Sequence, residues 1–310
     1  MNKFLSTRLG LAIAATALTA GIANAADRMV LVEDFNATWC GPCVPAGSAM
    51  IQLEDAHEDQ VIAVQIHVSD NVTLTFGTNR AAWYNVTGIP ACWFDGRTAQ
   101  VGAFPNVAQN VTLYTNLMNA RLAVPTDVAV QLWATQIDGD SYNVTAEYTL
   151  ESDAPAAQAM KLTIYQIRDN FPTTGAHYSN CLRAVSPVET VTLQPGATHT
   201  QTWVSNLVAG DATNISKVGY VAFAQETGAT PGPNTEVLNA NVIRHPFPVP
   251  PPTATPGDTD ADGDIDLVDL ATLLSNFGVT AGRNWSHGDF DGNGAVNLTD
   301  LAALLSNFGL

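Results

Sequence analysis

Between residues 26 and 124, short apolar runs alternate with segments of helical spacing. Strands are expected at Met29 to Phe35, Val61 to Val68, Cys92 to Phe94 and Thr98 to Val101, and helices at Val44 to Ala56, Arg80 to Tyr84 and Val107 to Ala123. Asn106 is a typical helix cap, and Asp95-Gly96 favours a hairpin turn. The alternation predicts an α/β domain over residues 26–124, with strands joined by crossover helices.

Past Pro125 the pattern changes to short β-rich runs, often alternating between apolar and polar positions. The runs are Val128 to Trp133, Tyr142 to Leu150, Lys161 to Arg168, Glu189 to Leu193, Thr200 to Val204, Val218 to Ala224 and Glu236 to Ile243. Turn sequences such as Asp138-Gly139-Asp140 separate them. About seven strands at this spacing predict an all-β sandwich domain over residues 125–245.

A proline-rich stretch, 246–256, then favours extended polyproline II and is expected to be a semi-rigid linker. Residues 257–310 contain a repeat at an offset of 31, in which an Asp- and Gly-rich run precedes Leu-Ala-x-Leu-Leu-Ser-Asn-Phe-Gly. The recurring leucines predict two helices around one small core, and they are Leu270, Leu273, Leu274, Leu301, Leu304 and Leu305. The chain is therefore expected to be multidomain, ending in a small α-helical domain.

Residues 1–25 have the pattern of a secretory signal peptide. Lys3 and Arg8 precede an apolar segment from Leu9 to about Ala20, and Ala23-Asn24-Ala25 is a small-residue cleavage pattern. A membrane span is the alternative, which the short apolar core and its Thr and Gly content weaken. We expect an exported protein (periplasm, cell surface or secreted) with no membrane span in the mature chain, in a compartment where disulfides persist.

Composition and charge narrow the classes of function. The chain has 310 residues, of which 46% are hydrophobic and 13% charged, enough for two or three domains with real cores. Its formal net charge of −17 argues against binding to nucleic acid, whose phosphates require Lys and Arg. The acidity instead suggests solubility or cation binding.

The candidate chemistry lies in Trp39-Cys40-Gly41-Pro42-Cys43, between a predicted strand and a predicted helix. The N-terminus of a helix stabilises a thiolate, so Cys40 is the expected nucleophile and Cys43 the resolving thiol. Trp39 can shield the sulfur from water. A zinc site and an inert structural disulfide are the alternatives, although the other two cysteines, Cys92 and Cys181, are far apart in the sequence.

The run from Asp34 to Cys43, followed some fifty residues later by Val86-Thr87-Gly88-Ile89-Pro90, resembles thioredoxin. The resemblance implies that Pro90 is cis, that Ile89 offers backbone groups to a substrate strand, and that Asp34 is a buried acid that exchanges a proton with Cys43. The alternative for Asp34 is a solvent-facing carboxylate at a strand end.

The chain departs from cytoplasmic thioredoxins at two positions, Asn36, where they have an aromatic residue, and Cys92. Cys92 is most simply a buried free thiol, although a bond to Cys181 stays open because the number of cysteines is even. The strand-rich region, with an element from His177 to Arg183 and a late Val-Leu-Asn-Ala run, resembles the Omp28-related bacterial proteins.

The C-terminal repeat has the spacing of EF-hand-type calcium loops, with oxygen ligands at positions one, three, five, nine and twelve, a glycine at six and a backbone carbonyl at seven. The candidate ligands are Asp258, Asp260, Asp262, Asp264, Asp266 and Asp269 in the first loop and Asp289, Asp291, Asn293, Ala295, Asn297 and Asp300 in the second. We expect two calcium ions and no organic cofactor. A solvated acidic tail, the alternative, would lack the periodic leucines.

Aspartate at position twelve, where EF-hands have glutamate, resembles dockerin repeats. The resemblance implies a calcium-folded EF-hand-like domain and a cohesin-like scaffold protein as a possible partner. Loop positions ten and eleven carry much of the cohesin specificity in dockerins. Here they are Leu267-Val268 and Leu298-Thr299, which differ from the common Ser-Thr pair.

Two functions from different classes follow. The first is a secreted thiol-disulfide oxidoreductase that acts on protein disulfides or dithiols and is attached to a partner through a calcium-dependent dockerin module. The second is a non-catalytic surface or assembly protein, in which the thioredoxin-like and β-sandwich domains serve binding.

Overall fold

The structure is a computed structural model that describes residues 26–173, 176–228, 235–248, 255–260, 264–280, 283–291 and 293–309. The expected signal peptide, linker residues 249–254 and Asp262 lie outside these ranges. Within them, no helix combines the length and the apolar character needed to cross a membrane.

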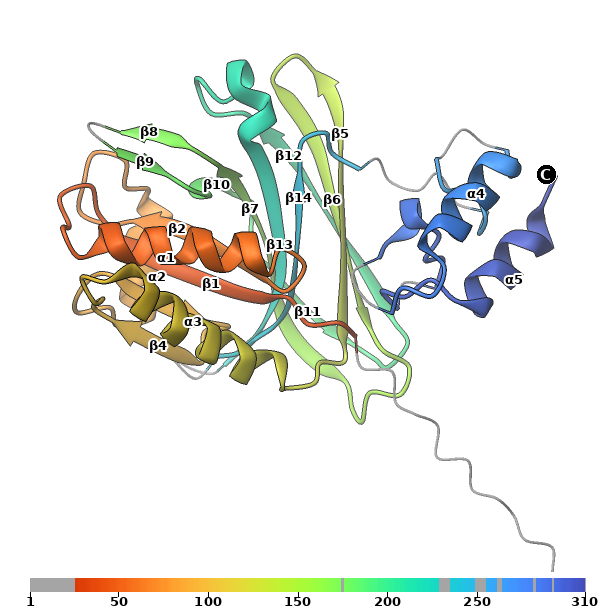
Figure 1. The fold of residues 1–310 in the computed structure, drawn as a ribbon, viewed down its shortest axis with the longest axis horizontal. Helices are drawn as coiled ribbons and strands as arrows, with labels where there is room; N and C mark the ends of the chain where they lie inside the picture. Colours follow the sequence, from red (N-terminus) through yellow and green to blue (C-terminus); the bar gives the residue numbers. More distant parts are fainter. Residues whose placement is uncertain are drawn as a thin grey trace, which may run out of the picture.

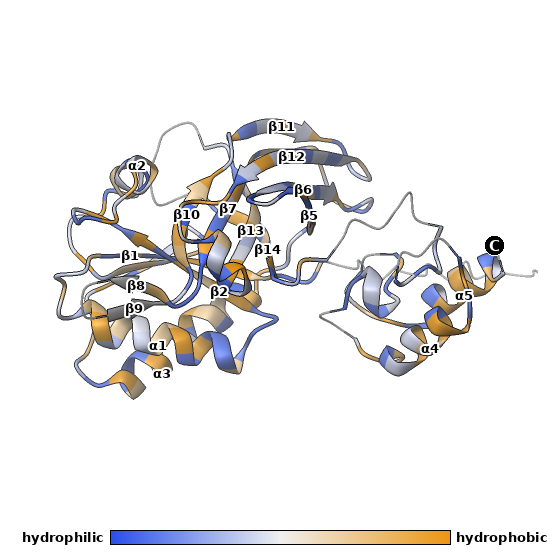
Figure 2. Cartoon of the chain, turned by 90° about the horizontal axis from the view of Figure 1, so that it is seen from above, coloured by the Kyte–Doolittle hydropathy of each residue, from blue (hydrophilic) through white to orange (hydrophobic). Residues whose placement is uncertain are grey.

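The α/β part follows the predicted order. Its elements are β1 (Val30–Asn36), α1 (Cys43–Ala56), β2 (Val61–His67), α2 (Thr75–Trp83), β3 (Ala91–Phe94), β4 (Thr98–Val101) and α3 (Val107–Leu122). β2 pairs with β1 in parallel, β3 pairs with β1 antiparallel, and β4 forms a hairpin with β3 (Figure 1). α1 and α3 cover one face of this sheet and α2 covers the other, as Figure 2 shows from above.

The capping prediction for α3 is confirmed, whereas α2 differs from its prediction. The Asn106 side chain accepts hydrogen bonds from two backbone N–H groups in the first turn of α3. α2 begins five residues earlier than the expected Arg80. Gly77 explains the early start, because a Cβ there would lie 2.9 Å from Ile66 Cγ2 of β2. Only glycine allows the helix to lie this close to the sheet.

All seven predicted strands beyond residue 125 are present, several of them longer than expected. They are β5 (Val128–Asp138), β6 (Ser141–Leu150), β7 (Gln158–Arg168), β11 (Glu189–Leu193), β12 (Thr198–Asn206), β13 (Val218–Glu226) and β14 (Val237–Arg244). The unpredicted elements are β8 (Phe171–Thr173), β9 (Ala176–Tyr178), β10 (Cys181–Val185) and the 3-10 helix η1 (Ala212–Lys217).

The β-rich strands do not form a sandwich separate from the α/β part. β10 pairs in parallel with β2 through Cys181 and Gln65, and a nine-stranded sheet runs in the order β14-β13-β7-β10-β2-β1-β3-β4, with β11 paired to β7. β2 is buried along its whole length. Without β10 it would be an edge strand with unpaired backbone groups. The expected boundary near residue 125 is therefore crossed by one continuous sheet.

A second, three-stranded sheet (β12-β6-β5) supplies the two-layer arrangement that the alternating pattern predicted. Its apolar side chains, such as Tyr148, pack against residues of the large sheet, such as Leu162. Phe247, from the expected linker, joins this core, with its ring centroid 5.2 Å from that of Tyr220. The first linker residues therefore belong to the β-rich region.

A buried polar network also joins the early and late segments. The Glu33 carboxylate of β1 accepts two hydrogen bonds from Arg80 of α2, at 2.8 and 2.7 Å. It also accepts from Tyr84 Oη at 2.6 Å and from Tyr165 Oη of β7 at 2.9 Å. Each buried group has a partner, so the network fixes the β-rich strands to the α/β part.

The C-terminal part contains α4 (Leu267–Asn276), the 3-10 helix η2 (Trp285–His287) and α5 (Leu298–Asn307). Asp266 and Asn297 cap the two α-helices, and each forms a reciprocal capping box with the aspartate three residues further on. The repeated sequence therefore gives two repeated helix starts.

The predicted small core is present with fewer leucines than expected. Leu273 and Leu304 are fully buried and pack with Ile265, Phe290 and Val296, while Leu270 and Leu301 are partly buried. The expectation that Leu274 and Leu305 join the core is wrong, since they are 53% and 55% exposed. One row of leucines from each helix is enough to cover a core of this size.

Candidate functional site

Cys40 and Cys43 form a disulfide at the start of α1. Pro42 is the N-cap residue and Cys43 the first residue of the helix, so the missing N–H of proline costs no helix hydrogen bond. Both cysteines are 6% exposed, and the first turn of α1 carries no acidic residue. When the disulfide is reduced, the helix N-terminus can stabilise a thiolate at Cys40.

The segment before the disulfide is held by the loop after β2. The Trp39 side chain is 65% exposed, and its indole N–H donates to the carbonyl oxygen of Ser69 at 3.0 Å. The backbone N–H of Thr38 donates to Asp70 Oδ2 at 2.8 Å, and His67 Nδ1 lies 2.7 Å from the same oxygen. Sequence reasoning missed Asp70, whose only signal was the turn-forming run Ser69-Asp70-Asn71.

The Ile89–Pro90 segment packs next to the disulfide. The Ile89–Pro90 peptide bond is cis, which confirms that expectation. The Ile89 side chain packs against Cys40 and Cys43, and the Pro90 carbonyl accepts a hydrogen bond from Gly102 N–H at 2.8 Å. The structure therefore brings Pro90 and the two cysteines together from positions some fifty residues apart.

Asp34 is fully buried in β1, which rules out the solvent-facing alternative. Its carboxylate accepts from Asn36 Nδ2 at 3.3 Å and from Cys92 Sγ at 3.4 Å. Burial raises the pKa of Asp34 from 3.8 to about 6, although both hydrogen bonds act to lower it. A carboxyl group with this pKa can gain or lose a proton near neutral pH, as a general acid or base requires.

The remaining cysteines, Cys92 in β3 and Cys181 in β10, are free and buried. The possible bond between them is therefore not formed, and four cysteine ligands for zinc are not brought together. Burial raises the pKa of both thiols, and for Cys92 the nearby Asp34 raises it further. Both side chains are thus expected to stay protonated at neutral pH.

An apolar surface lies beside the disulfide. Val44, Val101 and Phe104 are large hydrophobic residues with exposed side chains. Next to Cys40 and Cys43 lies a pocket of about 640 Å³, lined by Gly41, Pro42, Val44, Pro45, Ser48, Ala103, Pro105 and Val107. An exposed apolar patch of this kind is typical of a surface that contacts other molecules.

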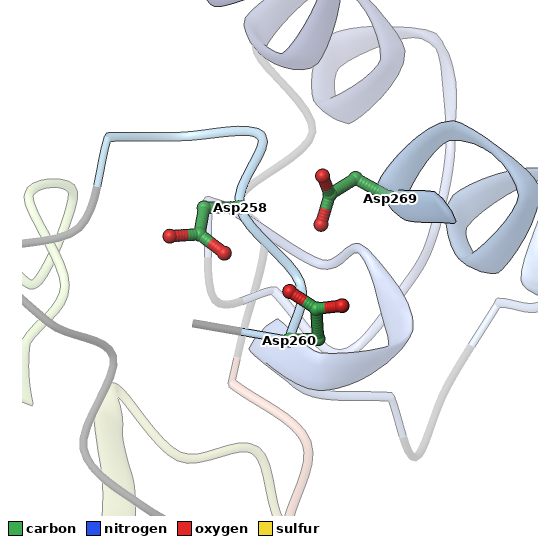
Figure 3. Close-up of side chains that lie close together, drawn as sticks. All are labelled: Asp258, Asp260 and Asp269. Atoms are coloured by element: carbon green, nitrogen blue, oxygen red, sulfur yellow. The ribbon is translucent and has the colours of Figure 1, made fainter. Parts of the chain in front are cut away.

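The predicted ligands of the first acidic loop converge in space. Figure 3 shows Asp258 and Asp260 on the loop and Asp269 on α4 pointing toward one another. One carboxylate oxygen from each of these three aspartates lies within 4.8 Å of the other two. Asp264, Asp266 and Asp269 form a second set with the same spacing. The Asp269 carboxylate is held by the backbone N–H groups of Thr259 and Asp266.

The second loop repeats this geometry with Asp289, Asp291 and Asp300. Gly294 N–H donates to Asp289, and Asn293 N–H donates to both Asp289 and Asp291. Burial raises the pKa of Asp289 to about 7, and the neighbouring carboxylates add to the rise. Carboxylate oxygens are the ligands that a hard cation prefers, and its positive charge would offset the repulsion between these carboxylates.

Known proteins of one family match the first part of the chain. A thioredoxin family model matches residues 12–117. Thioredoxin-T of Drosophila melanogaster is 32% identical over 130 residues, which cover 42% of this chain and 76% of that protein. Thioredoxin of Chlorobaculum thiosulfatiphilum is 39% identical over 64 residues, which cover 21% of this chain and 53% of that protein.

Two solved structures share the fold over a longer span. HBP35 of Porphyromonas gingivalis has a TM-score of 0.59 at 16% identity, covering 72% of this chain and 77% of that chain. A protein of Agrobacterium tumefaciens has a TM-score of 0.51 at 18% identity, covering 69% of this chain and 93% of that chain. This likeness in fold includes part of the β-rich region.

The sequence match and the geometry agree on one family. Thioredoxin-T is 32% identical across 76% of its own length, and the disulfide occupies the active-site position of that family, at the start of α1 and beside a cis proline. This chain therefore belongs to the thioredoxin family.

Proposed function

We propose that this protein is an exported thiol-disulfide oxidoreductase that acts on protein substrates. The observation that carries the proposal is the Cys40–Cys43 disulfide at the N-terminus of α1, with cis Pro90 beside it and Asp34 buried in the adjoining strand. Membership of the thioredoxin family implies protein disulfides as substrates. The apolar surface with Val44 and Phe104 suits contact with a polypeptide.

The reaction proceeds in two exchanges. The Cys40 thiolate attacks one sulfur of a substrate disulfide, so a Cys40–substrate bond forms, the substrate bond breaks and a substrate thiolate leaves. Asp34 accepts the proton of the Cys43 thiol, and the Cys43 thiolate attacks Cys40. The products are a substrate dithiol and the oxidised Cys40–Cys43 pair, which a thiol reductant returns to the dithiol. The reverse sequence oxidises a substrate dithiol.

Reduction of insulin disulfides by dithiothreitol and refolding of reduced ribonuclease test this proposal. The wild-type protein should accelerate at least one of these reactions, and Cys40→Ser should abolish the acceleration. Cys181→Ser is the matched control, because it removes a buried thiol that is not part of the disulfide. Wild-type activity no greater than that of Cys40→Ser would overturn the proposal and favour the non-catalytic binding function.

We also propose that the C-terminal part is a dockerin-like module that binds two calcium ions and attaches the protein to a cohesin-like scaffold protein. The aspartate sets around Asp269 and Asp300 support the calcium sites. Leu267 and Leu298, at loop position ten, are 71% and 73% exposed, as a contact surface requires. Removal of calcium should unfold this part, because the clustered carboxylates repel one another and its core is small.

Calorimetry and circular dichroism test the calcium proposal. Titration of chelated full-length protein should reveal uptake of two calcium ions, and chelation should reduce the helical signal. An unchanged spectrum together with no calcium uptake would contradict it. Export rests on the signal-peptide pattern of residues 1–25, and N-terminal sequencing of the protein secreted by a bacterial host should begin at Ala26.

A further inference from the structure

Within the described part of the chain, the carboxylate of Asp34 has two hydrogen-bond donors, and both come from the positions at which the sequence departs from cytoplasmic thioredoxins. Asn36 Nδ2 lies 3.3 Å from Oδ2, and Cys92 Sγ lies 3.4 Å from Oδ1. All three side chains are buried, so water does not compete for these bonds. Burial disfavours the ionised form of Asp34, and these two donors oppose that effect.

Strand pairing fixes Cys92 in this position. Asp34 of β1 and Cys92 of β3 are direct partners in the antiparallel register, so their side chains point to the same face of the sheet. That face is covered by α1 and α3. Cys92 also follows cis Pro90 by two residues, which connects it rigidly to the segment that packs on the disulfide.

Tyr114 of α3 orients the thiol. Its Oη lies 3.7 Å from Cys92 Sγ and is buried. The thiol has a single proton, and the carboxylate of Asp34 is its strongest acceptor nearby. The Tyr114 hydroxyl is then free to donate to the sulfur, which gives the ordered chain Tyr114 O–H, Cys92 S–H, Asp34 carboxylate.

We infer that Cys92 is a positioning residue for thiol-disulfide exchange, whose S–H holds the Asp34 carboxylate in its ionised, proton-accepting form. The inference rests on the proposed function and adds to it a residue outside the Cys40–Cys43 pair. Loss of the S–H bond should leave Asp34 protonated over a wider pH range. The proton of Cys43 then lacks an acceptor in mildly acidic solution, and the second exchange slows there.

Among the residues that the structure describes, the other groups around Asp34 do not supply a competing charge to its carboxylate. From β2, its register partner is Gln65, which is uncharged. His67, at the end of β2, is engaged by Asp70. Glu54 of α1 accepts from Ala63 N–H at 2.9 Å, further along β2.

The test compares Cys92→Ala, which removes the donor, with Cys92→Ser, which keeps one. In insulin reduction, the acid limb of the pH profile should move up by about one pH unit in Cys92→Ala, a tenfold loss of activity on that limb with little change above it. In Cys92→Ser, the midpoint of the acid limb should lie at or below that of the wild type. Cys181→Ala is the matched control, because it removes the other buried thiol, which lies in β10, two strands from the β1 strand of Asp34, and it should leave the profile unchanged.

Carbon-13 NMR titration of the Asp34 carboxyl group separates this inference from the proposed function. Asp34 should titrate at higher pH in Cys92→Ala than in the wild type, and Cys92→Ser should reverse the change. If the wild type reduced no disulfide, the proposed function would fail, and the titration would still decide the role of Cys92. An Asp34 titration identical in the wild type and Cys92→Ala, or displaced equally by alanine and serine, would overturn the inference.

Discussion

Replacement of Asp34 by asparagine should shift the stability of the oxidised protein in favour of the variant as pH rises. Burial raises the pKa of Asp34 from 3.8 to about 6 in the folded state. Below pH 3.8 the carboxyl group is protonated in both the folded and unfolded states, so its ionisation does not change the free energy of unfolding. As pH rises from 3.8 to 6, the unfolded state ionises more easily, so the folded state loses stability relative to it.

The size of the effect follows from that rise. At about 1.36 kcal/mol for each pKa unit, the wild type loses about 3 kcal/mol between pH 3.5 and pH 7.5. Asparagine does not titrate, so the variant escapes this loss. Asn36 and Cys92 both donate to the carboxylate of Asp34, whereas the asparagine amide has only one accepting oxygen. Its Nδ2 therefore faces one of these donors, which lowers the stability of the variant by about 1–3 kcal/mol at every pH. This constant cost cancels when the stability difference between variant and wild type at pH 3.5 is subtracted from that at pH 7.5.

Guanidinium unfolding of the oxidised wild type and Asp34→Asn at pH 3.5 and 7.5 measures the effect. The advantage of the variant should be about 3 kcal/mol larger at pH 7.5 than at pH 3.5. Asp70→Asn is a control of opposite sign, because the hydrogen bonds of Asp70 to His67 and Thr38 hold its pKa below the ordinary value despite partial burial. That variant should lose stability toward pH 7.5. An advantage of Asp34→Asn that is equal at both pH values would refute the reasoning.

The remaining predictions concern the buried network and the acidic loops. Glu33→Ala should lower the free energy of unfolding by about 3–5 kcal/mol, because Arg80 stays buried without its carboxylate partner. Glu58, just after α1, is exposed, so Glu58→Ala is the control in guanidinium unfolding, and a loss as small as that of the control would contradict the network. Asp300→Ala should reduce calcium uptake from two ions to one in calorimetry, since the first loop keeps its ligands; an unchanged stoichiometry would count against the second site.

The chemistry of the site was readable from sequence because it depends on short motifs. Cys40 and Cys43 are three residues apart, and the Ile89-Pro90 step is a local pattern whose cis geometry the structure confirms. The surroundings of Asp34 were less readable. Cys92 was expected to be a small buried hydrophobe, and only the register between β1 and β3 reveals that it faces Asp34.

The pairing of the strands could not be read from their pattern. Alternation of apolar and polar residues tells which side of a strand is buried, and it does not tell which strand lies beside it. β10 contacts β2 through a single register pair, Cys181 with Gln65, and β8 and β9 are three residues each. Such short elements carry too few positions for a period to be recognised.

The predicted helix limits and core positions were wrong where tertiary packing overrides local preference. α2 begins before Arg80 because Gly77 lets it approach Ile66, a contact between residues eleven positions apart. In the C-terminal repeat, Leu273 and Leu274 look alike in the sequence, and only the first reaches the core. The helix period gives the apolar side, while the width of the buried stripe depends on the partner.

The central claim is that Cys40 attacks a substrate disulfide and Cys43 resolves the product. Trapping tests it most directly. Reduced Cys43→Ser and Cys40→Ser proteins are mixed with insulin, quenched with acid and mapped by mass spectrometry without reductant. The account predicts a mixed disulfide between Cys40 and insulin that accumulates in Cys43→Ser and is absent from Cys40→Ser. Accumulation through Cys43 in the Cys40→Ser protein, or no adduct in either, would contradict it.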